Sequence, residues 1–150
     1  RDEVQAVLSF HPDGTLGYMS CLVVEQTNAF DLFDYHVIDE KTLERALVTF
    51  YSYASWFYKR VSEKKRPVFS LYTMVALFNK QGKRLGKKPA SPPSSMTIGW
   101  PGENQNNPLI IPQQPLKIAY AGLLDFQNLS QELMHLIIRA YKAGGLYYEA

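Results

Sequence analysis

The first part of the chain alternates apolar and polar residues with a period of two, as a half-buried β-strand does. The apolar positions of this run are Val4, Ala6, Leu8 and Phe10. The turn sequence Pro12-Asp13-Gly14 follows, in which proline restricts φ and glycine accepts a positive φ. A second run, from Leu16 to Glu25, is apolar on both faces. We therefore predict a β-hairpin whose second strand lies in the interior of a sheet.

The next segment, QTNAFDLFDYHVI, is acidic, aromatic and aperiodic, which predicts a loop or a short helical turn. Over about residues 39–64, apolar residues recur at alternating steps of four and three, the spacing of one helix face. They are Leu43, Leu47, Phe50, Ala54, Phe57 and Val61. Asp39 is placed to cap the start of this helix, and Pro67 to end it.

The residues from Val68 to Asn79 are apolar at both odd and even positions, which predicts a central strand covered on both faces. NKQGKR then predicts a turn. Prolines are dense between about residues 86 and 115, so we predict a long loop there, with one short strand at SMTIGW. Leu116 to Phe126 predicts a further strand, and helical spacing returns over about residues 129–143.

These elements predict a single α+β domain over residues 1–150. We expect a mainly antiparallel twisted sheet of four to five strands, in the order ββα-β(β)β-α, with both helices packed on it. This order resembles that of longin, roadblock and related sensor-type α+β modules. The resemblance extends to element order alone, and a fold does not by itself imply a function.

Acidic and basic residues are unevenly distributed along the chain. Residues 1–44 carry nine acidic and two basic side chains, whereas residues 59–88 carry ten basic side chains and one acidic one. These basic residues form two clusters that flank the apolar Val68–Asn79 run. They indicate either an anionic partner, such as nucleic acid or acidic lipid, or solvated charges that keep an apolar strand soluble. RNA binding would also need exposed aromatic residues on the sheet, for which Phe69 and Tyr72 are the candidates.

A second set of aromatic residues lies on the predicted long helix, away from its apolar face. Tyr53 and Trp56 share a face, with Arg60 one turn later, while Tyr51 and Tyr58 lie beside them. This set is either a wide buried stripe under the proline-rich loop or an exposed surface that receives a partner chain. The loop, which contains Trp100, is the natural companion of such a surface, because extended proline segments dock on aromatic residues.

Catalytic and metal-binding patterns are weak. The single cysteine, Cys21, allows no intrachain disulfide and fits a reducing compartment such as the cytoplasm. We interpret Asp31, Asp34 and His36 as an acidic surface loop, and His135 as a histidine at the edge of a buried helix face. The sequence contains no glycine-rich phosphate loop and no metal-ligand spacing. We therefore expect no cofactor, no metal and no catalytic centre, and no transmembrane segment.

The prediction is a non-catalytic module for protein–protein interaction or assembly, which binds a protein partner or itself. Nucleic-acid or anionic-surface binding through the basic clusters is the first alternative. A small-molecule sensor, with a pocket between the sheet and the long helix, is the second. The candidate binding residues are Tyr53, Trp56, Arg60, Lys64, Lys65, Arg66, Lys80, Lys83, Arg84, Lys87, Lys88 and Trp100.

Overall fold

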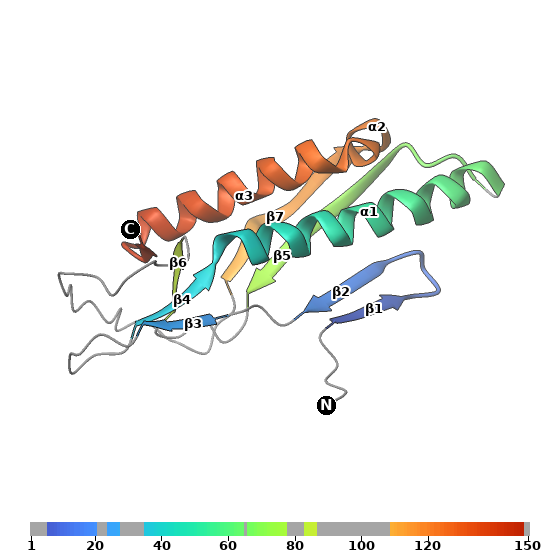
Figure 1. Ribbon diagram of the computed structural model, residues 1–150. Coiled ribbons are helices and arrows are strands. Elements are labelled where there is room, and N and C mark those ends of the chain that lie inside the picture. The colour runs from blue at the N-terminus through green and yellow to red at the C-terminus, as the bar shows by residue number, and fades with distance from the viewer. Residues whose placement is uncertain are drawn as a thin grey trace, which may run out of the picture.

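Three helices and eight strands make up the described part of the computed structural model, which comprises residues 6–20, 24–27, 35–64, 66–77, 83–86 and 109–148 (Figure 1). The helices are α1 (Glu40–Lys64), α2 (Tyr120–Leu124) and α3 (Phe126–Ala143). The strands are β1 (Ala6–Phe10), β2 (Leu16–Ser20), β3 (Val24–Thr27), β4 (Tyr35–Asp39), β5 (Ser70–Leu77), β6 (Lys83–Gly86), β7 (Leu109–Ala119) and β8 (Tyr147–Tyr148). The predicted α+β class is thus confirmed, whereas the predicted single sheet is replaced by three smaller ones.

The long helix α1 begins where the sequence predicts, because Asp39 caps it. The Asp39 carboxylate accepts a hydrogen bond from the backbone N–H of Thr42 at 3.2 Å and another from the Thr42 hydroxyl at 2.8 Å. The first of these bonds satisfies an amide that the first helical turn leaves unpaired. α1 ends at Lys64, shortly before Pro67, so the predicted boundaries of about 39–64 are confirmed.

The strands β5 and β7 form a two-stranded antiparallel ribbon. On β5 the side chains of Leu71 and Val75 pack against the core, whereas those of Tyr72 and Met74 are exposed. The predicted central strand is therefore covered on one face only, and its prediction as a strand buried on both faces is wrong. Apolar residues occupy both faces of this strand, and the pattern alone does not say whether a second layer covers the outer one.

The strands β1 and β2 form the predicted hairpin around the turn at Gly14, whose φ is 90°. The hairpin packs on α1 through aromatic residues: Phe10 lies against Phe57, and Tyr18 is stacked on Phe50. Among the described strands β2 pairs only with β1, so its prediction as an interior strand is not met by this part of the chain. Residues 21–23, which the sequence places in the same strand, lie outside the described residues.

A four-stranded sheet, in the order β3-β4-β6-β8, lies near the start of α1 and the end of α3 (Figure 1). The β3–β4 pair is antiparallel, but the β4–β6 and β6–β8 pairs are parallel. This sheet corrects two predictions. The expected loop before Asp39 contains the end of β3 and most of β4, and the last residues of the expected NKQGKR turn are the first residues of β6. Its strands are two to five residues long, which is too short to show a period.

The C-terminal elements are shifted from their predicted positions. β7 begins at Leu109, inside the predicted loop, and residues 87–108 of that loop lie outside the described residues. The register of β7 on β5 shifts next to Pro112 and Pro115, where extra residues of β7 form a bulge. The end of the predicted strand, after Ala119, is the short helix α2, and α3 then runs to residue 143 as predicted.

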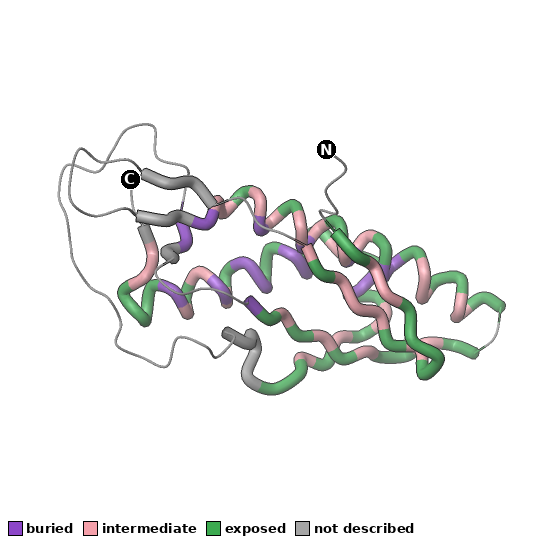
Figure 2. Tube along the Cα trace, turned by 90° about the horizontal axis from the view of Figure 1, so that it is seen from below, coloured by how far each residue is buried: buried purple, intermediate pink, exposed green. Residues whose placement is uncertain are grey.

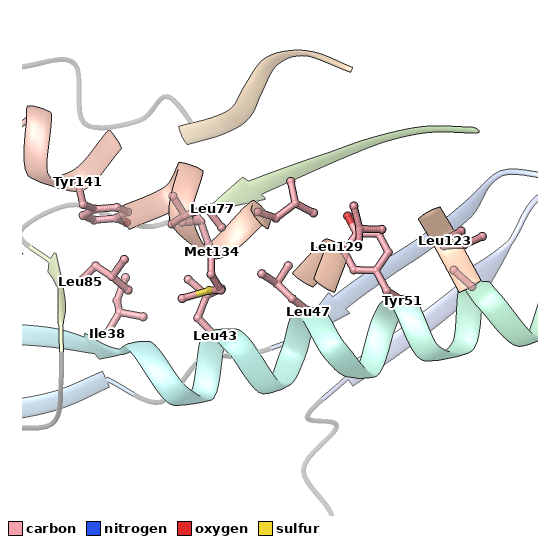
Figure 3. Close-up of a cluster of buried hydrophobic side chains, with 13 residues drawn as sticks. Ile38, Leu43, Leu47, Tyr51, Leu77, Leu85, Leu123, Leu129, Met134 and Tyr141 are labelled. Atoms are coloured by element: carbon pink, nitrogen blue, oxygen red, sulfur yellow. The ribbon is translucent and has the colours of Figure 1, made fainter. Parts of the chain in front are cut away.

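The core lies where α1 and α3 pack against each other and against the strands (Figures 2 and 3). Its buried apolar residues are Ile38, Leu43, Leu47, Tyr51, Ala54, Leu77, Leu85, Leu123, Leu129, Leu133, Met134, Ile137 and Tyr141. Six of these thirteen residues come from α2 and α3, four come from α1, and three come from the strands β4, β5 and β6. The two long helices therefore supply most of the burial, and the sheets cover their sides.

Candidate binding surfaces

One face of α1 presents aromatic and basic side chains to solvent. Tyr53 is 49% exposed and Trp56 is 56% exposed, and Arg60 is also exposed. The guanidinium carbon of Arg60 lies 4.7 Å from the centroid of the Trp56 ring, a cation–π geometry. Helical spacing alone brings these side chains together, because residues three and four apart lie on one face. We call Tyr53, Trp56 and Arg60 the Trp56 face.

The other two aromatic residues of the same set have structural contacts. The Tyr51 hydroxyl lies 2.6 Å from the Thr73 hydroxyl of β5, and the Tyr58 hydroxyl donates to the Gly14 carbonyl of the hairpin turn at 2.6 Å. Burial raises the pKa of both phenols above its usual value. The predicted set thus divides: Tyr51 and Tyr58 hold strands on the helix, and the residues of the Trp56 face are left exposed.

The predicted basic clusters do not form a single patch in the described part of the chain. Lys64 and Arg66 are exposed at or just after the C-terminal end of α1. Lys83 and Arg84 belong to β6, which lies near the N-terminal end of α1 (Figure 1). A helix of 25 residues is about 37 Å long, at about 1.5 Å per residue. That length is several times the screening distance of about 8 Å at physiological salt. The candidates that lie outside the described residues are Lys65, Lys80, Lys87, Lys88 and Trp100.

A second exposed apolar surface lies on the outer face of the β5–β7 ribbon. Tyr72 is 69% exposed and Met74 lies on the same face of β5, while Phe69, one residue before β5, is 79% exposed. Lys117 of β7 is directly opposite Tyr72 and is also exposed. The sequence pattern indicates Phe69 and Tyr72 as candidates only for RNA binding, and it does not single out Met74 and Lys117. A period of two along a strand with one solvated face is the pattern that would identify Met74 and Lys117.

The described part of the core contains a buried phenol whose pKa is raised. Tyr141 is buried on α3, its hydroxyl has no hydrogen-bond partner among the described residues, and burial raises its pKa to about 12. A phenol with such a pKa stays neutral at pH 7. His135 is exposed on α3, not at the edge of the buried face as predicted. The described residues contain no group of three or more His, Cys, Asp or Glu side chains that could hold a metal ion.

Comparisons with known proteins give no relative for this chain. No protein-family model, no curated protein and no solved structure matches it. Among the described residues, no helix combines the length and apolar character that a membrane span requires.

Proposed function

We propose that this domain is a protein–protein interaction module and that the Trp56 face is its contact with a partner chain. One observation carries the proposal: a tryptophan more than half exposed, with an arginine stacked on it, on a rigid helix. Tryptophan, tyrosine and arginine are the residue types that contribute most to binding energy at interfaces. The helix holds them in place before binding, so little conformational entropy is lost when a partner covers them.

The orientation of the Trp56 face supports the same conclusion. The helix already contacts the hairpin through Phe50 and Phe57 and the β5–β7 ribbon through Tyr51. The Trp56 face is a third side of α1, and it makes no contribution to the buried core among the described residues. Large aromatic side chains that the fold itself does not use are more simply explained by a binding role than by stability.

The test is affinity purification of the tagged chain from its source cells, at low and high salt, followed by titration with the purified partner. We expect Trp56→Ala to weaken binding roughly tenfold or more, as for an interface hot spot. His135→Ala is the matched control, because it truncates an exposed side chain on the other long helix. A chain that is monomeric and without a partner at both salt concentrations would contradict the proposal, as would full binding by Trp56→Ala.

Single-stranded nucleic acid is the second candidate, and the outer face of the ribbon favours it. Tyr72 is exposed there, and Lys117 lies opposite it across the strand pair. Phe69 and Arg66, shortly before β5, are exposed as well. Exposed aromatic rings stack on bases, and cations neutralise phosphates. A fluorescent single-stranded oligonucleotide should then bind with an affinity that falls steeply with salt. Tyr72→Ala and Lys117→Glu should each weaken it, whereas Trp56→Ala should not. Salt-independent binding, or none, removes this candidate.

A further inference from the structure

The strand β5 has one edge that no other described strand pairs with. The backbone N–H of Tyr120 donates to the Phe69 carbonyl at 3.0 Å, which fixes the residues of β5 that bond to β7. Because N–H and C=O groups alternate in direction along a strand, Leu71 and Thr73 point their backbone groups at β7. The residues that point their backbone groups away from β7 are Ser70, Tyr72, Met74 and Ala76. We call this row of donors and acceptors the β5 edge.

The β5 edge lacks the features that usually prevent pairing with another chain. Native edge strands carry proline, charged residues, bulges or very short lengths. β7 has such features, namely Pro112, Pro115 and the bulge opposite Thr73 and Val75. β5 runs for eight residues, SLYTMVAL, without a proline or a charged side chain. The two edges of the ribbon are therefore different, and only that of β5 is suited to accept a further strand.

Consecutive residues of α1 contact the hairpin and the ribbon. Tyr18 of β2 is stacked on Phe50 at 5.7 Å between ring centroids, and Thr73 of β5 contacts the hydroxyl of Tyr51. β2 and β5 nevertheless do not pair with each other. Figure 1 shows α1 running past both the hairpin and the ribbon. The helix thus holds two strands that are not joined by backbone hydrogen bonds.

The side chains that these two sheets direct at α1 are incompletely buried. Leu16 and Tyr18 of the hairpin are only partly buried, and so are Leu71 and Val75 of the ribbon. Phe50 of α1, which is stacked on Tyr18, is partly buried as well. A strand added at the β5 edge would place every second side chain beside these residues and remove more of their apolar surface from water.

We propose that the β5 edge binds one extended segment of a partner polypeptide, which adds to the ribbon as a third strand on the side of the hairpin. Backbone hydrogen bonds to Tyr72 and Met74 supply the affinity, and apolar residues at alternate positions of the segment supply the selectivity. We expect a single strand as the occupant and not a second copy of this domain. A second copy would have to bring its own hairpin and α1 to the same edge. This inference rests on the proposed function and names a contact of its own.

The probe is a library of random twelve-residue peptides displayed on phage and selected on the intact chain. We expect the enriched peptides to alternate apolar residues. Met74→Pro removes an outward N–H without touching the β7 ladder, and it should weaken a selected synthetic peptide at least tenfold. Met74→Ala, the matched control, keeps the N–H and should stay within about threefold of the wild type.

A second measurement uses the unaltered protein, so that misfolding of Met74→Pro does not decide the result. The selected peptide is N-methylated at one position at a time. Methylation at alternate positions should abolish binding, because every second N–H of an added strand faces β5. Equal effects at all positions, unchanged binding by Met74→Pro in a folded protein, or no enriched peptide would each overturn the inference.

Two further outcomes separate this inference from the proposed function. If Trp56→Ala weakens the natural partner while Met74→Pro leaves that partner and the peptides unaffected, the proposed function stands and the strand addition is wrong. If light scattering gives a dimer that Met74→Pro converts to a monomer, the occupant is a second copy, and the proposal of a partner segment is overturned.

Discussion

Two sides of the same helix differ in exposure in this protein. Tyr51 is 1% exposed and contacts β5 through its hydroxyl, while Trp56, five residues later, is 56% exposed and is stacked with Arg60. Both are aromatic and both lie outside the regular apolar repeat of α1. The difference teaches that residue type does not decide whether an aromatic side chain is buried or exposed. The position of the strands around the helix decides it.

Truncation of the buried aromatic side chain should have the largest effect on the free energy of unfolding. Tyr51→Ala removes a fully buried ring and should lower the free energy of unfolding by about 3–5 kcal/mol, as large-to-small core substitutions do. Trp56→Ala removes a larger ring and should change it by only about 0.5 kcal/mol, because exposed residues contribute little to stability. Urea denaturation of both variants measures this. A Trp56→Ala loss as large as that of Tyr51→Ala would show that the Trp56 face is structural.

Alkaline pH should reveal the buried phenols. Burial raises the folded-state pKa of Tyr141 to about 12, while an unfolded tyrosine titrates near 10. Stability is therefore fully present below about pH 10 and is lost as the pH rises toward 12, because the unfolded chain releases this proton first. Tyr141→Phe should reduce the loss, whereas Tyr53→Phe, at an exposed position, should not. Unfolding curves at pH 8 to 11.5, at fixed ionic strength, measure this loss of stability for each variant.

Removal of a single hydroxyl should have the smallest effect on stability. It distinguishes the contribution of a hydrogen bond from that of burying the ring. Tyr51→Phe leaves the Thr73 hydroxyl without its 2.6 Å partner and should destabilise the fold by about 1–2 kcal/mol. Tyr141→Phe removes a buried hydroxyl that has no partner among the described residues, so it should be neutral or slightly stabilising at pH 7. Thermal unfolding of both variants tests this. Equal losses would mean that the Tyr51–Thr73 contact contributes nothing specific.

Local signals in the sequence predicted the long elements well. The four-and-three spacing, the Asp39 cap and Pro67 define α1, and the turn at Gly14 defines the hairpin. Each of these depends on neighbours in the chain, which is why the pattern is sufficient. The same helical spacing placed Tyr53, Trp56 and Arg60 on one face, and the structure leaves that face exposed.

The sequence by itself determined the α+β class, the two long helices and the hairpin, because those depend on period, capping and turn chemistry. Only the tertiary structure decided that β5 is covered on one face and that β4, β6 and β8 pair in parallel. The tertiary structure also decided that Tyr51 is buried and that Trp56 is exposed. Burial and long-range pairing depend on which distant segments meet, and no pattern within a short window of residues contains that information.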